Sequence, residues 1–154
     1  MSQSKTLPIG IKVIIAFFVL SALLWTVGQG GAVIAYDTVA GWGLQDLRDA
    51  IDPAIVEVNR GIGLADIIVQ MPLFLIAILG LWKLKYFGLV ASWLALGTTL
   101  YWPIVFLSSQ YFYKQAGIKY QPTPPSVYLI LGCIVLFALW AAWYLFKVRR
   151  LFDR

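Results

Sequence analysis

Long apolar runs separated by short polar segments dominate the pattern of this chain. A helix needs about 20 apolar residues to cross the ~30 Å hydrocarbon core of a bilayer. Four runs reach that length, and they predict membrane spans over residues 9–34, 62–82, 86–107 and 126–146. The pattern therefore predicts an all-α integral membrane protein, a four-helix bundle that forms a single domain over residues 1–154.

The longest polar connection, residues 37–61, carries a pattern of its own. Apolar residues recur in it at spacings of three and four, which is typical of one face of a helix. These positions are Leu44, Leu47, Ile51, Ile55 and Val58. Asp52 and Pro53 form a favourable N-cap and first-turn pair, so we expect two short helices that break at Asp52. The second then runs almost directly into the second span. The apolar stripe predicts an amphipathic segment that lies on the membrane surface or caps the bundle.

The distribution of Lys and Arg indicates how the spans are oriented. Cytoplasmic flanks of membrane helices carry an excess of these residues. With the N-terminus inside, the cytoplasmic flanks hold Lys5, Lys12, Lys83, Lys85, Lys147, Arg149, Arg150 and Arg154. The outer flanks hold fewer, namely Arg48, Arg60, Lys114 and Lys119. We therefore expect both termini to be cytoplasmic, in a prokaryotic-type inner (plasma) membrane.

Composition supports the membrane assignment and narrows the partners. Hydrophobic residues make up 61% of the chain and charged residues 12%, with a mean hydropathy of +0.83. A soluble domain is about 45–50% apolar and about 25% charged. The net charge of +5 comes from basic residues at the ends of apolar runs, and no nucleic-acid motif accompanies it. The lipid bilayer is thus the expected partner, and nucleic acid is not.

Missing residue types limit the chemistry that the chain can perform. Histidine is absent, which excludes haem ligation by His, most zinc sites and the commonest general base. The single cysteine, Cys133, lies inside an apolar run, where it is expected to be a small packing residue. We therefore expect no enzyme, no catalytic residue, no metal and no cofactor. The enzymatic alternative that stays open is proton transfer on a lipophilic substrate by Asp66 with Tyr101.

Two prolines, Pro72 and Pro103, fall inside the second and third predicted spans. Each removes a backbone hydrogen bond and tends to kink its helix. Thr98 and Thr99 lie one turn before Pro103, where a hydroxyl could meet a freed carbonyl. Kinks in these adjacent spans predict a pocket between them in the outer half of the bundle.

Polar side chains near the outer ends of the spans form the candidate site. Asp66 and Gln70 lie one helical turn apart on the second span. Tyr101 and Trp102 are expected to join them from the third span, and Gln29 from the first. An ionisable group inside a membrane helix is a functional candidate, because its insertion into hydrocarbon costs ~2.5–3.5 kcal/mol.

Three interpretations of Asp66 stay open at the level of sequence. If the helix starts near Gly63, Asp66 lies in its first turn, where free N–H groups and the helix dipole favour a carboxylate. It could then pair with Arg60 or Lys119. Alternatively, Asp66 belongs to a ligand, ion or proton site, or it makes a polar contact with a partner protein.

The sequence favours a non-enzymatic accessory or assembly subunit of a membrane complex. Rows of small residues, such as Ala91, Ala95 and Thr99, allow close packing within the bundle, against other membrane subunits or in a homo-oligomer. The alternative is a binder or transporter of a small or lipophilic ligand, which would occupy the outer-half pocket between spans two and three.

Overall fold

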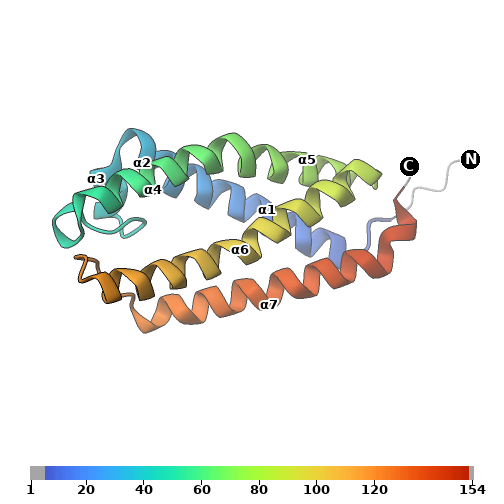
Figure 1. Ribbon diagram of the computed structural model, residues 1–154. Helices are drawn as coiled ribbons and strands as arrows, with labels where there is room; N and C mark the ends of the chain where they lie inside the picture. The colour runs from blue at the N-terminus through green and yellow to red at the C-terminus, as the bar shows by residue number, and fades with distance from the viewer. Residues whose placement is uncertain (1–5, 153–154) are drawn as a thin grey trace, which may run out of the picture.

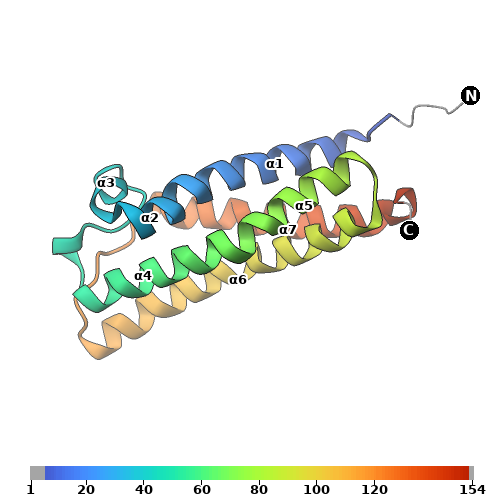
Figure 2. The same ribbon diagram turned by 90° about the horizontal axis from the view of Figure 1, so that it is seen from above.

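The computed structural model describes residues 6–152, and every regular element in that range is a helix. Four helices are long and apolar enough to cross a membrane, and they cover Ile9–Ile34, Pro53–Trp82, Tyr86–Ala116 and Pro125–Leu151. Figures 1 and 2 show them side by side along one long axis, with the start of α1 and the end of α7 at the same end. The prediction of an all-helical chain with four membrane-length helices is confirmed.

Two of the four long helices are built from consecutive pieces. The first comprises α1 (Ile9–Trp25), the π-helical turn η1 (Thr26–Gly30) and α2 (Gly31–Ile34). The second comprises α4 (Pro53–Ala65), the π-helical turn η3 (Asp66–Gln70) and α5 (Met71–Trp82). The others are α6 (Tyr86–Ala116) and α7 (Pro125–Val148), which ends in the 3-10 turn η4 (Arg149–Leu151). The first connection holds only α3 (Tyr36–Gly41) and the 3-10 turn η2 (Arg48–Ala50).

The second long helix begins at Pro53, so the short helix expected after Asp52 is continuous with the span expected from residue 62. Asp52 is extended and its Oδ1 accepts a hydrogen bond from the Ala54 amide at 2.8 Å, which confirms it as the N-cap. The proline at the first helical position needs no hydrogen-bond partner for its nitrogen. The polar connection is therefore shorter than predicted, and α4 extends the second span towards the loop.

The Asp52 cap leads to a direct test of this helix start. Asp52→Ala should lower the free energy of unfolding by about 1 kcal/mol, because the Ala54 amide loses its acceptor. Asp52→Ser keeps an acceptor at the same position and should recover most of that loss. Reversible unfolding in mixed detergent micelles measures both changes. Equal stability of the alanine and serine variants would show that the cap contributes nothing.

The prediction of an amphipathic helix before Asp52, in the stretch that holds Leu44, Leu47 and Ile51, is wrong. Gly43 has φ +75 after α3, and the only helical turn in the stretch is η2. Backbone hydrogen bonds to the loop before α7 replace helical ones: the Asp52 amide donates to the Lys119 carbonyl, and the Leu47 amide donates to Gln121 Oε1. Ile51 is consequently buried while Leu47 is exposed, so the residues with helical spacing do not share one face.

The third helix is longer than expected, because α6 continues past residue 107 to Ala116. It runs through the buried Pro103 as one helix and ends at Gly117, whose left-handed conformation (φ +66) is a common helix stop. At its other end α6 meets α5 very closely, with Gly80 packed against Gly88. Gln70, which precedes Gly80 by ten residues in the second span, donates a hydrogen bond to the Ala95 carbonyl of α6. These contacts hold the second and third spans together.

The fourth helix packs against the bundle mainly through one half. In its C-terminal half, the Phe137 ring lies 4.4 Å from the Phe17 ring of α1, and Tyr144 covers Gly10. The buried side chains Ala138, Ala141 and Leu145 belong to the same half. In the other half Leu129 is 74% exposed, and few side chains are buried. Helix α7 therefore leaves α1 as the two approach the loops.

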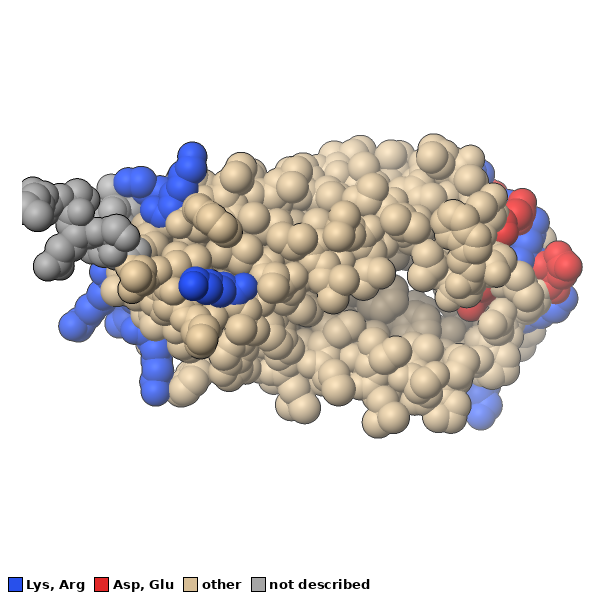
Figure 3. Space-filling model, turned by 180° about the vertical axis from the view of Figure 1, so that it is seen from behind, with Lys and Arg blue, Asp and Glu red and all other residues tan. Residues whose placement is uncertain are grey.

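Charged residues separate strongly along the bundle. In Figure 3 the visible Asp and Glu side chains lie at one end, with some Lys and Arg, while the opposite end shows only Lys and Arg. We name the first the acidic end, formed by residues 35–52 and 117–124, and the second the basic end, formed by residues 83–85 and 147–152. Figure 3 also shows a hollow in the half near the acidic end, between the side formed by α1 and α2 and the side formed by α7.

Candidate functional site

Two π-helical turns, η1 and η3, lie against each other in the half of the bundle near the acidic end. A Cβ added at Gly63 would be 2.6 Å from the Gln29 carbonyl oxygen, and one at Gly30 would be 3.3 Å from Ile67. The Gln45 side chain donates to the Gly28 carbonyl at 3.4 Å, so the loop also reaches η1. Single π-turns inside helices are rare and occur frequently at functional sites. Three sequence candidates, Gln29, Asp66 and Gln70, lie on these two turns.

Asp66 lies inside the bundle, where Trp25 of α1 donates its indole N–H to Asp66 Oδ2 at 3.1 Å. The helix begins thirteen residues earlier, at Pro53, which is ~20 Å at 1.5 Å per residue. The helix-start interpretation of Asp66 is therefore wrong. Arg60 is engaged elsewhere, with Glu57 and the Val33 carbonyl.

The Asp66 carboxylate retains most of its capacity to accept hydrogen bonds. An ionised carboxylate offers about four lone-pair positions. Among the described residues, Trp25 is its one hydrogen-bond donor. Lys119, the other cation considered for it, donates instead to the Asp49 carbonyl. Asp66 is thus a half-buried acceptor that is oriented by an indole and has no cation beside it.

Gln70 is buried and joins the second span to the third. Its Nε2 donates to the Ala95 carbonyl at 3.2 Å, and the Thr98 hydroxyl donates to its Oε1. The Thr99 hydroxyl also donates to the Ala95 carbonyl, at 2.8 Å. Pro103 leaves the Thr99 carbonyl without its helical partner. Both threonine hydroxyls instead reach the Ala95 carbonyl, one turn earlier. Gln70 therefore acts as a link between helices through both ends of its amide.

Aromatic rings surround the Asp66–Trp25 pair. Trp102 of α6 lies 6.2 Å from Trp25 in an edge contact and stacks on Phe106 at 5.4 Å. Phe74 of α5 makes a second edge contact with Trp25, also at 6.2 Å. Helices α1, α5 and α6 each contribute a ring, and Trp25 joins them to the carboxylate. We name Trp25, Asp66, Phe74, Trp102 and Phe106 the Trp–Asp cluster.

The structure brings together only part of the predicted site. Trp102 contacts Trp25, but its neighbour Tyr101 is 65% exposed and lies on the outer face of α6. Gln29 lies on η1, against Gly63, and makes that contact through its backbone. Trp25, Phe74 and Phe106 were missed. A tryptophan well inside an apolar run, away from the usual aromatic belt, is a signal that could have pointed to Trp25.

The Trp–Asp cluster does not contain a set of metal-binding side chains. No group of three or more Cys, Asp or Glu side chains within metal-binding distance occurs in residues 6–152. A carboxylate beside indole and phenyl rings suits a positive charge or a hydrogen-bond donor carried on an apolar body. Comparison of the chain with protein-family models, curated proteins and solved structures found no match.

Proposed function

We propose that this protein binds a lipophilic molecule whose polar end is a cation or a hydrogen-bond donor. The observation that carries the proposal is the Asp66 carboxylate, which lies within a membrane-length helix and has Trp25 as its one hydrogen-bond donor in residues 6–152. The polar end of the ligand contacts Asp66. The apolar body lies against the rings of Trp25, Trp102 and Phe106.

The energetics of a carboxylate in a membrane helix support this choice of ligand. Its insertion costs ~2.5–3.5 kcal/mol on translocon scales, and one hydrogen bond offsets only part of that cost. A cationic or donor group beside Asp66 offsets more of it. The faces of indole rings also attract cations. A neutral hydrocarbon would leave the carboxylate as it is, and an anion would be repelled.

The divergence of α7 supports entry from the bilayer. Near the acidic end α7 is largely exposed, and Figure 3 shows the hollow between it and the α1–α2 side. The link from Gln70 to Ala95 closes the second span onto the third at this level. We therefore propose a ligand site beside α1 and α7, in place of the pocket expected between spans two and three.

Fluorescence quenching in vesicles tests the proposal. Dodecylamine carrying bromine on its chain should quench the protein's tryptophan emission more than brominated dodecanoate at the same membrane content. The difference should shrink when Trp25→Phe and Trp102→Phe are combined, because these rings are nearest the proposed site. Trp143→Phe, at an exposed position near the basic end, is the matched control and should leave the difference intact. Equal quenching by amine and carboxylate would reject the proposal.

An orientation with both termini cytoplasmic, in a prokaryotic-type inner membrane, completes this proposal. It is supported by the separation of charge in Figure 3, since an excess of Lys and Arg is typical of the cytoplasmic side. The acidic end and the Trp–Asp cluster then belong to the outer half of the bilayer, from which the ligand enters.

A role as an accessory or assembly subunit is the second candidate, and a different feature favours it. The N-terminal half of α7 is mostly uncovered by the other helices. At Gly132 no atom from outside this helix lies within 4 Å of the position that a Cβ would take. Small residues on an open face let another membrane helix approach closely. Native mass spectrometry after mild detergent extraction should then show a second subunit, and Gly132→Leu should release it. A monomer without any partner would reject this role.

A further inference from the structure

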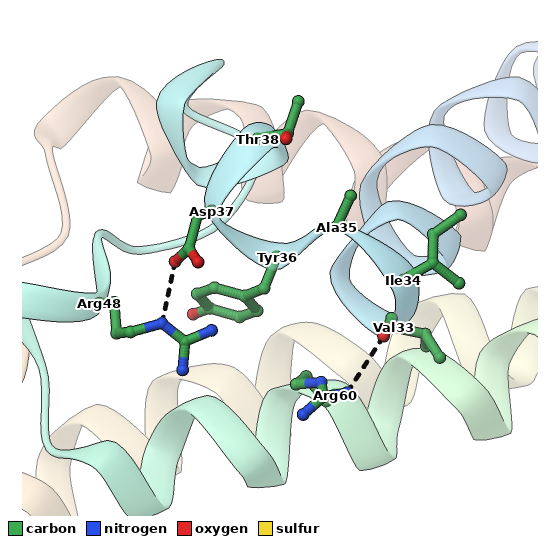
Figure 4. Close-up of a pocket in the computed structure, with 8 residues that line it drawn as sticks. All are labelled: Val33, Ile34, Ala35, Tyr36, Asp37, Thr38, Arg48 and Arg60. Atoms are coloured by element: carbon green, nitrogen blue, oxygen red, sulfur yellow. Dashed lines mark hydrogen bonds and ion pairs between the residues drawn. The ribbon is translucent and has the colours of Figure 1, made fainter.

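A pocket lies at the acidic end, remote from the α5–α6 hairpin. None of its lining residues takes part in the proposed function. It is an open pocket with a volume of about 290 Å³, lined by Val33, Ile34, Ala35, Tyr36, Asp37, Thr38, Arg48 and Arg60 (Figure 4). Such a volume is at the lower limit of small-molecule sites, so it suits a compact polar group. We name it the rim pocket.

The rim pocket lies at the level where a membrane helix gives way to loop. Val33 and Ile34 are the last residues of the first membrane-length helix, Ile9–Ile34. The chain then breaks at Ala35 (φ −150, ψ 55) and turns into α3. The polar lining residues Asp37 and Thr38 follow directly, Arg48 comes from the loop, and Arg60 comes from the middle of α4. Lipid phosphates occupy this boundary level of a bilayer.

Tyr36 lines this pocket and carries a buried hydroxyl. Its side chain is only 4% exposed, and its hydroxyl has no hydrogen-bond partner among the described residues. The Asn59 side chain is near enough to influence the hydroxyl, but the distance and angle between them are not those of a hydrogen bond. A buried hydroxyl without a partner costs about 1–3 kcal/mol, so it is rarely retained without a purpose.

Burial raises the pKa of Tyr36 above its ordinary value of 10.0, and this outweighs the opposing influence of Asn59. The hydroxyl therefore stays protonated at neutral pH and can donate a hydrogen bond. In Figure 4 it is directed towards the Arg48 side chain, whose guanidinium carbon lies 5.2 Å from the centre of the Tyr36 ring.

The two arginines of the rim pocket keep unused donors. A guanidinium has five N–H groups. Arg48 uses Nε on Asp37 at 2.9 Å, and Arg60 uses one terminal nitrogen on Glu57 and the other on the Val33 carbonyl. Most N–H groups of both side chains are thus free to meet a ligand. With Asp37 and Glu57 counted, the cluster is neutral, so recognition depends on directed donors more than on net charge.

We propose that the rim pocket binds a singly charged phosphate group, of the kind that a phospholipid headgroup carries. Arg48 and Arg60 donate N–H groups to its oxygens from two sides, and the Tyr36 hydroxyl donates a third hydrogen bond. Several oxygen acceptors on one compact group match such converging donors. This site is separate from the Trp–Asp cluster, and it stands whether or not the cluster binds a lipophilic ligand.

Titration of the delipidated, detergent-solubilised full chain tests this site. Short-chain phosphatidylglycerol should bind, as measured by calorimetry and by native mass spectrometry. Tyr36→Phe should weaken this binding by about tenfold while leaving the empty protein as stable as wild type or more so, because an unpartnered hydroxyl is removed. Arg48→Gln with Arg60→Gln should weaken it further. Lys114→Gln, a basic residue outside the pocket, is the control and should bind like wild type.

A competition experiment identifies the source of the phosphate group. Phosphatidylglycerol that binds and is not displaced by inorganic phosphate supports a lipid headgroup as the ligand. Displacement at similar concentration supports free phosphate as the ligand of the same site. The proposal is overturned if neither compound binds, or if Tyr36→Phe and the paired arginine variant bind phosphatidylglycerol as tightly as wild type.

Discussion

Gly88→Ala should destabilise the bundle by about 3 kcal/mol, which is at the upper end of the cost of adding a methyl group to a well-packed core. A Cβ at Gly88 would overlap the backbone of Gly80 and Leu81 in the preceding helix. Backbone atoms cannot turn aside as a flexible side chain can, so α5 and α6 would have to separate along their hairpin. Gln70, which bonds to the Ala95 carbonyl further along α6, would then lose its geometry too.

Gly97→Ala is the matched control, because it lies on the same helix and has no atom within 4 Å of a new Cβ. It should keep or raise stability, since alanine favours a helix over glycine by ~1 kcal/mol. Both variants can be compared by unfolding in mixed micelles of increasing sodium dodecyl sulfate content. If Gly88→Ala and Gly97→Ala unfold at the same content, the close contact of α5 and α6 does not exist in the membrane.

Asp66→Leu should produce the largest loss of ligand binding. Removal of a charged hydrogen-bond partner costs about 1.5–3 kcal/mol, which corresponds to roughly a 10–100-fold loss of affinity for dodecylamine. The same change should not lower stability, because it removes a carboxylate from a membrane helix. Asp66→Asn retains an acceptor for the Trp25 indole but no charge, so its affinity should lie between those of Asp66→Leu and wild type.

Glu57→Gln controls for the general loss of a carboxylate from this helix. Glu57 is exposed and pairs with Arg60, so its replacement should leave dodecylamine binding unchanged. The quenching titration in vesicles measures all three variants. If Asp66→Leu lowered stability and left amine binding unchanged, the carboxylate would serve only to join Trp25 to the second span. That result would not affect the proposal for the rim pocket, because the residues that would bind phosphate there are Tyr36, Arg48 and Arg60.

The membrane-length helices could be predicted because hydropathy is a local, additive property of the sequence. Each run of about 20 apolar residues identifies a span whatever its neighbours are. The cap at Asp52 was also predictable, since its hydrogen bond reaches only to Ala54. The end of α6 was harder to predict, because this helix continues to Ala116 through polar sequence where hydropathy falls.

The loop illustrates why spacing alone was insufficient. Leu44, Leu47 and Ile51 have helical spacing, yet the backbone of this stretch bonds to residues about 70 positions later, such as the Lys119 carbonyl. Those partners are invisible in a local window. Competition between distant and local hydrogen bonds therefore removed the expected helix.

The sequence by itself determined which segments are membrane-length helices, which end of the bundle is acidic, and that Asp66 is a polar group within an apolar stretch. Only the tertiary structure decided what Asp66 meets. A single residue step turns an α-helical side chain by about 100°, so Trp102 contacts Trp25 while its neighbour Tyr101 faces outwards. That choice depends on how α1, α5 and α6 are rotated against one another, and their rotation is fixed by close contacts such as Gly63 with Gln29 and Gly80 with Gly88. Such contacts join residues far apart in the chain, and no local pattern records them.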